Sequence, residues 1–329
     1  MSVSAKLDRF QQTRSWVGFP LAVIYKFTDD QGGYLTATLA YYSFLSLFPL
    51  LLLLTTVLGF ILAGDVSAQH RVLSSTLSQF PIIGDQIRTN VTSLKGSAVA
   101  LSVGIAGSLY GGLGVAQAGQ NAMNNMWGVP RNRRPNPVKA RVKSITAVLA
   151  LGAGAVGTTV LSGLFTASGS GGLHLGVAGR MVALAISLIG NIALFVAGFR
   201  MLTADHIHRR QLVPGAVAAA VAWQALQSLG SYYVRHSLAH ATQTYGLFGV
   251  VLGLVAFLHL AALLTLLCAE VNVVRARRLW PRSLLTPFTD NVELTDADER
   301  SYEALATTQQ AKGFEDIDVT FNNTRDPGL

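Results

Sequence analysis

The sequence predicts an all-α, polytopic membrane protein with six transmembrane helices in one bundle. Only 13% of its 329 residues are charged and half are hydrophobic, whereas an ordinary soluble domain carries about 25% charged residues. A transmembrane helix needs about 20 mostly apolar residues to cross about 30 Å of hydrocarbon. Six stretches meet this requirement, at roughly 35–63, 97–120, 143–166, 178–202, 212–234 and 246–274.

The basic residues indicate how these helices are oriented. If the N-terminus is cytoplasmic, 20 of the 25 Lys and Arg residues lie on the cytoplasmic side. The outer loops then keep only five of them: Arg71, Arg88, Lys95, Arg180 and Arg235. Because Lys and Arg are retained in cytoplasmic loops, this asymmetry predicts that both termini are cytoplasmic.

The same topology divides the chain into three segments. Residues 1–34 are expected to be a cytoplasmic segment with an amphipathic helix on the membrane surface, and residues 35–280 a six-helix membrane domain. Residues 281–329 are expected to form an acidic, mostly disordered cytoplasmic tail, because 10 of the 17 acidic residues follow residue 285. In the outer loop 64–96, apolar residues with rough helical spacing predict one or two further amphipathic helices.

The composition argues against a metal site or a bound cofactor. Cys268 is the only cysteine, so neither a disulfide nor a cysteine-based metal site can form within one chain. The spacings His206-x-His208 and His236-x3-His240 each supply two ligands, whereas a catalytic zinc site needs three from the protein. We therefore expect no metal and no cofactor.

The sequence also argues against an enzyme and against a nucleic-acid partner. No P-loop, zinc-protease, G-x-S-x-G or paired-carboxylate motif is visible in it, so no residue is assigned a catalytic role. The net charge of +8 is explained by membrane topology and by attraction to anionic headgroups. The expected partners are membrane lipids, including anionic headgroups at the cytoplasmic face, and a homo-oligomer stays open.

Polar side chains recur on the predicted spans at helical spacing. Amides and hydroxyls in hydrocarbon must find partners, so they either hold the helices together or line a polar cavity. The residues of this candidate polar path are Tyr42, Ser46, Gln120, Asn124, Asn191, Gln224, Gln227, Ser231, His259, Glu270 and Asn272.

Glu270 is the only acidic residue within a predicted span. An ionisable group inside a membrane is a functional hypothesis by default. Because Glu270 lies near the inner end of its span, five residues before Arg275, pairing with a basic neighbour is the alternative to a transport or proton role. His259 lies about three turns earlier on the same face, and either forms a proton relay with Glu270 or is a neutral side chain bonded to a neighbouring helix.

Small residues repeat every four positions on the second span. One row contains Gly104, Ser108 and Gly112, and the other contains Gly107 and Gly111. Such rows let helix backbones approach closely in lipid, so we interpret these residues as helix-packing positions and not as a ligand loop.

Four stretches, in their order and spacing, resemble the YihY / virulence factor BrkB family of bacterial inner-membrane proteins. They are Gly33–Pro49 (GYLTATLAYYSFLSLFP), Asn121–Trp127 with the basic loop after it, Asn191–Arg200 continuing through Pro214-Gly215-Ala216 to Tyr232, and Tyr245-Gly246 to Cys268-Ala269-Glu270-Val271-Asn272. The resemblance covers roughly residues 15–280. The chain departs from the family pattern at Cys268, where glycine is expected, at Thr203, which stands near an expected proline, and at Gly107 and Gly111–Gly112.

The resemblance implies six helices, cytoplasmic termini, the bacterial inner membrane and a link to envelope integrity. It also implies transport of a lipid or envelope precursor, which has been discussed for some members. Members were formerly labelled ribonuclease BN, but the predicted membrane domain contains no acidic metal cluster, so a ribonuclease is only a remote alternative. Our leading hypothesis is a transporter of a lipid or another amphipathic envelope component. The alternative is a non-transporting scaffold for envelope proteins.

Overall fold

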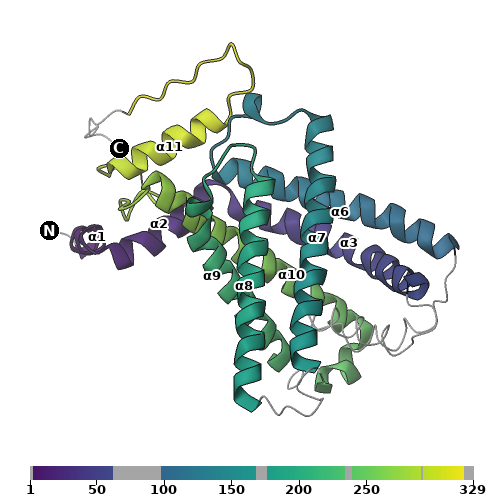
Figure 1. The fold of residues 1–329 in the computed structure, drawn as a ribbon. Coiled ribbons are helices and arrows are strands. Elements are labelled where there is room, and N and C mark those ends of the chain that lie inside the picture. The colour runs from purple at the N-terminus through teal and green to yellow at the C-terminus, as the bar shows by residue number, and fades with distance from the viewer. Residues whose placement is uncertain (1–2, 62–97, 168–175, 234–238, 290–291, 322–329) are drawn as a thin grey trace.

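The computed structural model describes residues 3–61, 98–167, 176–233, 239–289 and 292–321, and every regular element among them is a helix (Figure 1). The all-α prediction is therefore confirmed. The loop 64–96, for which we expect amphipathic helices, lies outside the described residues. The helices are α1 (Val3–Thr13), α2 (Ser15–Asp29), α3 (Gly32–Ile61), α6 (Ala98–Met126), the 3-10 turn η1 (Arg131–Arg133), α7 (Pro137–Ala167), α8 (Gly176–Leu202), α9 (Arg209–Tyr233), α10 (Ala239–Arg277) and α11 (Asp296–Thr308).

Four of the described helices are long and apolar enough to cross a membrane. Their candidate spans are Pro137–Thr158 in α7, Leu184–Leu202 in α8, Arg209–Gly230 in α9 and Val251–Arg277 in α10. These match the last four of the six predicted spans. The first two predicted spans are helical as α3 and α6, and their crossing of the membrane stays a prediction.

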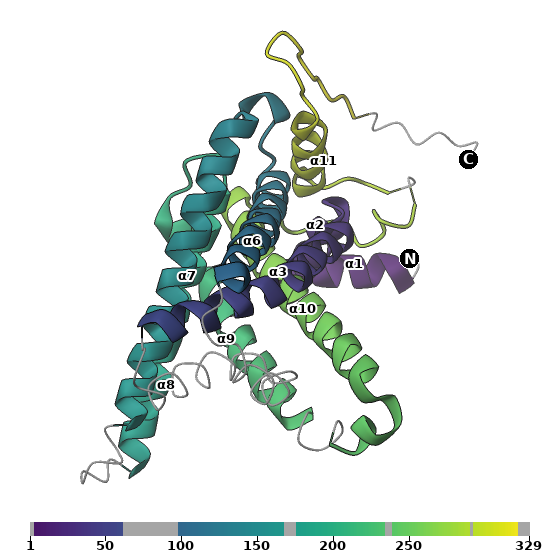
Figure 2. The same cartoon turned by 90° about the vertical axis from the view of Figure 1, so that its right-hand side faces the viewer.

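The helices do not all run in one direction. Neighbouring helices from α7 to α10 pack in sequence order, whereas α3 packs mainly on α6. In Figure 1 the α3–α6 pair runs across α7 and α8, and Figure 2 shows α8 and α10 diverging from each other. The described helices therefore cross one another, and six spans in one bundle stay a prediction.

The buried core lies where α2, α6, α8, α9 and α10 meet. It includes Met123, Trp127, Phe199, Leu212 and Val273. The segments 127–142, 203–208 and 278–282 lie at this end of the molecule, together with α1, α2 and α11 (Figures 1 and 2). The first and last of these segments carry Arg131, Arg133, Arg134, Lys139, Arg141, Arg278 and Arg282. We call this end the basic end.

Away from the basic end, large apolar side chains remain exposed along the candidate spans. Leu149, Ile189, Val221 and Leu252 are examples, one from each of the four helices. Apolar side chains of this size are normally buried in a soluble protein, because removing them from water is favourable. At these positions no described part of the protein packs over them. Their exposure is what a helix surrounded by lipid requires.

The small residues on α6 lie at helix contacts. A Cβ added to Gly111 would lie 2.5 Å from Cα of Ser46 on α3, and one added to Gly107 would lie 2.8 Å from Pro49. Gly112 faces Val148 of α7 instead, and Gly104 and Ser108 are buried. Gly112 therefore lies against a different helix from Gly107 and Gly111, because it occupies a different face of α6.

The tail differs from the expected disorder. The structure describes helix α11, whose first turn is closed by a capping box between Thr295 and Asp298. Asp298 is fully buried. The acidic residues that suggested a solvated tail thus include one that caps a helix, and T-x-x-D at 295–298 is the sequence signal for it.

Among the described glycines, Gly215 of α9 leaves the least room for a Cβ. A Cβ at this position would overlap the carbonyl oxygen of Cys268 on α10. We predict that Gly215→Ala lowers the free energy of unfolding by about 1–3 kcal/mol, because the backbones must separate. Thermal unfolding in detergent measures this effect.

The matched control is Gly152→Ala on α7, where an added Cβ meets no atom within 4 Å. This control should unfold at the wild-type temperature or slightly above it, because alanine favours a helix over glycine. Equal midpoints for the two variants would contradict the close α9–α10 approach.

Candidate functional site: a buried polar cluster and an adjoining cavity

Two predicted polar residues of α6 connect it to neighbouring segments. The side-chain amide of Gln120 donates hydrogen bonds to Ser144 Oγ at 2.8 Å and to the carbonyl oxygen of Ala140 at 3.2 Å, both on α7. Asn124 Oδ1 accepts a hydrogen bond of 2.7 Å from the backbone N–H of Ala204, just after α8. Both side chains are buried. They hold helices together, as one of the two sequence interpretations proposes.

On α10, Asn272 makes a similar connection to α9. Its Oδ1 accepts a 2.7 Å hydrogen bond from the backbone N–H of Gly215. That donor lies in the second turn of α9, which begins at Arg209. Asn272 Nδ2 is buried and has no hydrogen-bond partner among the described residues.

Glu270 is fully buried beside this contact, at 0% exposure. Neither of its carboxyl oxygens receives a hydrogen bond from a described residue. Electrostatic interactions connect Glu270 to Lys26 and Asp30 of the α2–α3 corner.

The corner itself is built by the chain between α2 and α3. Gln31 adopts φ 56°, which ends α2 and turns the chain into α3. Lys26 donates to Asp30 one turn later and also to the carbonyl oxygen of Met126 at 3.4 Å. Burial raises the pKa of Asp30 above its ordinary value, and the ammonium of Lys26 opposes this shift.

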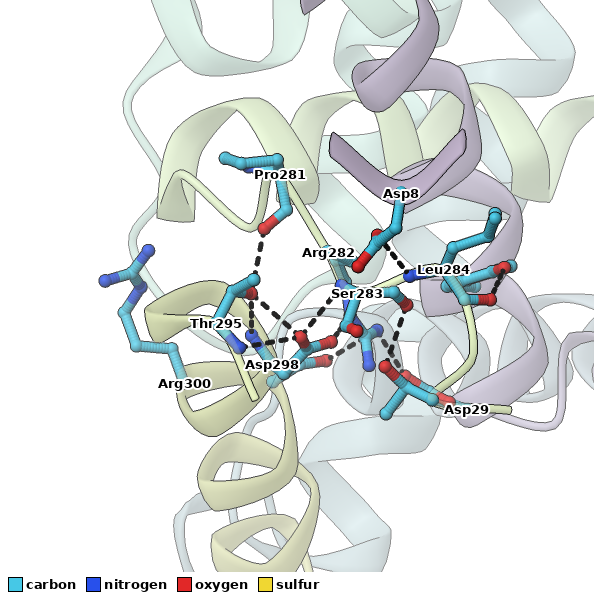
Figure 3. Close-up of polar contacts among 12 residues, drawn as sticks. Asp8, Asp29, Pro281, Arg282, Ser283, Leu284, Thr295, Asp298 and Arg300 are labelled. Atoms are coloured by element: carbon cyan, nitrogen blue, oxygen red, sulfur yellow. Dashed lines mark hydrogen bonds and ion pairs between the residues drawn. The ribbon is translucent and has the colours of Figure 1, made fainter. Parts of the chain in front are cut away.

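Asp29, the neighbour of Asp30, pairs with a second buried cation. Arg282 is 1% exposed, and its Nη1 donates to Asp29 at 2.6 Å while its Nε donates to Asp298 at 2.6 Å. Figure 3 shows Arg282 between these two carboxylates, with Ser283 and Thr295 also donating to Asp298. The pairing joins α2, the segment after α10 and α11.

Further contacts attach α1 to the same segment. Asp8 accepts a hydrogen bond of 2.9 Å from the backbone N–H of Leu284, and Tyr25 donates to the carbonyl oxygen of Leu284 at 2.7 Å. Gln11 donates to the carbonyl oxygen of Arg282. The N-terminal helices and the tail therefore form one connected layer on the basic end.

A cavity of about 720 Å³ opens beside this layer, between α7, α8 and the start of α9. Ala193, Val196 and Ala197 of α8 form its apolar wall. Its polar side chains include Lys143, Arg200, Asp205, His206 and Arg209. The cavity therefore has an apolar wall on α8 and a charged rim, which suits an amphipathic molecule.

Residues 23–289 match the family model of virulence factor BrkB. The chain belongs to the virulence factor BrkB family. It is similar to the inner membrane protein YhjD of Escherichia coli K12, with 25% identity over 264 residues that cover 74% of this chain and 77% of YhjD. It is also similar to the putative ribonuclease-like protein YfkH of Bacillus subtilis 168, with 25% identity over 262 residues that cover 77% of this chain and 93% of YfkH. No solved structure matches it significantly.

In this BrkB-family protein the other predicted path residues do not meet in one cavity. His259 is exposed on α10 whereas Glu270 is buried, so the structure does not bring the two together as a relay. Asn191 and Gln224 are partly buried, and the side chain of Ser231 lies outside the described residues. On α3, Ser46 donates to the carbonyl oxygen of Ser43 in its own helix.

Tyr42, the remaining path residue on α3, lies against Gly114 of α6, and Gln227 of α9 is partly buried. None of the eleven path residues lines the 720 Å³ cavity. Gln120 and Asn124 nevertheless fix its two sides, because Ser144 follows Lys143 and Ala204 belongs to the cavity lining.

Sequence reasoning missed the charged partners of the BrkB-family cluster. All four lie outside the predicted spans: Lys26, Asp29, Asp30 and Arg282. Charged residues are common there, so they do not indicate a site. The i, i+4 spacing of Lys26 and Asp30 was a usable signal for their pairing. Nothing in the sequence indicated that Arg282 would meet Asp29, because 253 positions separate them.

We predict that replacing Arg282 destabilises the basic end. Arg282→Met leaves the carboxylates of Asp29 and Asp298 without their cation, and breaking a buried pair in this way costs about 3–5 kcal/mol. The unfolding midpoint in detergent should fall, and limited proteolysis should cut α11 faster. Arg141→Met is the control because Arg141 is exposed; similar midpoints for both variants would show that the Arg282 pairing is not needed.

The raised pKa of Asp30 predicts a pH dependence of stability. The folded protein binds this proton more tightly than the unfolded chain does. The resulting stabilisation is complete below the unfolded pKa and is lost as the pH rises through the folded pKa. The unfolding midpoint of the wild type should therefore rise relative to that of Asp30→Asn as the pH is lowered.

Asp318→Asn, at an exposed position, should follow the wild type across the same pH range. If the unfolding midpoint of the wild type instead rose relative to that of Asp30→Asn as the pH increased, attraction to Lys26 would outweigh the effect of burial on Asp30.

Proposed function

We propose that this protein translocates a lipid or another amphipathic envelope component at the bacterial inner membrane and thereby supports envelope integrity. The single observation that carries the proposal is the cavity of about 720 Å³, with an apolar wall on α8 and charged side chains on its rim. Ligand pockets of about 300–1,000 Å³ are typical for small molecules. A cavity lined in this way matches a molecule with an apolar and a polar part.

The proposal includes a topology. The start of α7, the end of α8, the start of α9 and the end of α10 lie at the basic end, together with α1, α2 and α11. These four helix ends carry Lys143, Arg200, Arg209 and Arg275. Retention of Lys and Arg in the cytoplasm supports placing this end, and both termini, inside the cell. The relation to YhjD, an inner membrane protein by name, supports the same membrane. Six spans, with α3 and α6 as the first two, belong to the proposal.

The proposal assigns no enzymatic step and no nucleic-acid partner. Among the residues that the structure describes, no group of three or more His, Cys, Asp or Glu side chains could hold a metal ion. The ribonuclease-like name belongs to YfkH. Lipids are the partners proposed for this chain, and a homo-oligomer is compatible with its exposed apolar faces.

We predict that filling the cavity slows translocation. Ala197→Trp places an indole against the cavity wall, and overpacking of about 1–3 kcal/mol against a bound lipid corresponds to a loss of about 5- to 150-fold. The measurement uses liposomes with the reconstituted protein and a fluorescent phospholipid, whose outer-leaflet pool is bleached by a membrane-impermeant reductant. Ala153→Trp, on an exposed face of α7, should keep the wild-type rate. Equal rates for all three proteins would contradict the proposal.

A scaffold function is the second candidate, because Gln120, Asn124 and Asn272 hold helices together. In a scaffold, Ala197→Trp should leave envelope integrity in cells unchanged, whereas removing an acidic docking segment should impair it. Deleting residues 316–329 removes the end of the tail and keeps α11 and the Arg282 contacts. Loss of function only in this truncation favours the scaffold, and loss only in Ala197→Trp favours translocation.

A further inference from the structure

Cationic side chains from three parts of the chain meet at the rim of the cavity. Lys143 comes from α7, Arg200 from the last turn of α8, and Arg209 from the first turn of α9. Asp205 is the one carboxylate in the lining, and His206 lies beside it. Three basic side chains against one carboxylate favour an anion.

Part of this rim is preorganised. Lys143 Nζ donates a hydrogen bond of 2.5 Å to the carbonyl oxygen of Thr203, which places its ammonium next to the loop after α8. That loop is held by Asn124 through Ala204. Arg200 and Arg209 have no side-chain hydrogen bond or ion pair to any residue that the structure describes. Their guanidinium groups are therefore available to a ligand.

The position of the rim in the membrane narrows the class of anion. The candidate span of α8 ends at Leu202, so Arg200 lies at the level where hydrocarbon gives way to headgroups. Ala197, Val196 and Ala193 continue the same face of α8 one and two turns into the span. An anion bound by the rim would thus carry an apolar chain directly onto this wall.

We propose that this cavity binds the anionic headgroup of a phospholipid, with its phosphate at Lys143, Arg200 and Arg209 and an acyl chain along Ala193, Val196 and Ala197. This inference names the class of lipid for the proposed function. Binding of the lipid does not depend on that function, but its role as the transported molecule does. Basic pockets between membrane helices on the cytoplasmic side are suited to anionic headgroups. A guanidinium group can donate two parallel hydrogen bonds to one phosphate. In a zwitterionic headgroup the lipid's own ammonium competes for that phosphate, so an anionic headgroup should bind more tightly.

Free phosphate and RNA share the phosphate chemistry but not the apolar chain. Inorganic phosphate would need only the rim, and RNA would need an open basic surface rather than a wall of alanine and valine. The apolar wall is the feature that favours a lipid. Both alternatives become arms of the test.

The test measures lipid retention by native mass spectrometry of the detergent-solubilised full chain. The protein is titrated with phosphatidylglycerol or with phosphatidylethanolamine of the same acyl chains. The wild type should retain phosphatidylglycerol about tenfold better, the order expected for charge-assisted contacts. The Arg200→Gln/Arg209→Gln double variant should lose this preference, and Arg200→Lys/Arg209→Lys should keep most of it.

The matched control is Arg131→Gln/Arg133→Gln, which removes the same charge from exposed positions of η1 outside the cavity. It should retain the wild-type preference. A gain-of-function variant guards against misfolding: Asp205→Asn removes the only carboxylate of the lining and should raise retention of phosphatidylglycerol. Equal retention of both lipids by the wild type, or equal loss in the control, overturns the proposal.

Competition separates the other sources of phosphate. Millimolar inorganic phosphate or a short single-stranded RNA should leave the bound phosphatidylglycerol in place. Displacement by either one overturns the lipid assignment. The results distinguish failure of the site from failure of the proposed function. Selective retention without lipid translocation in liposomes would contradict transport only. Translocation that does not depend on Arg200 and Arg209 would contradict this binding site only.

Discussion

The buried charge of Arg282 is the constraint on which the basic end of this protein depends. A guanidinium that is 1% exposed is tolerable only if carboxylates reach it, and those carboxylates come from Asp29 and Asp298. Meeting this requirement holds α2 and α11 against the segment after α10. Because Asp30 follows Asp29, the same pairing also sets the position of the Lys26–Asp30 pair next to Glu270 on α10.

Polar residues on α6 link this layer to the cavity. Gln120 and Asn124 satisfy their amides by binding α7 and the loop after α8, which hydrocarbon demands of any buried amide. In doing so they hold Lys143 and Ala204 on two sides of one cavity. A residue that holds helices together can thus shape a binding site without touching the ligand, and the two interpretations of the polar residues are not exclusive at these positions.

The candidate site was predictable only in part. Glu270, Asn272, Gln120 and Asn124 stand out because polar groups are costly within apolar segments, and the structure places all four in buried contacts. His259 stands out for the same reason but lies on the exposed face of α10. Helical spacing gives the face of a helix, not which neighbour covers it. The basic rim residues went unnoticed as a site because positive charge at a membrane surface has a sufficient explanation in topology.

The sequence by itself predicted a helical chain with six apolar spans, four of which the structure describes as helices long and apolar enough to cross a membrane. It also predicted that most basic residues lie on one side. These properties follow from windows of about 20 residues, because hydrocarbon selects apolar runs and excludes charge locally. Only the tertiary structure decided that Arg282 meets Asp29, that Glu270 lies near Lys26 and Asp30, and that Lys143, Arg200 and Arg209 line one cavity. Such contacts join residues far apart in the chain, and they depend on how closely backbones approach at positions such as Gly215.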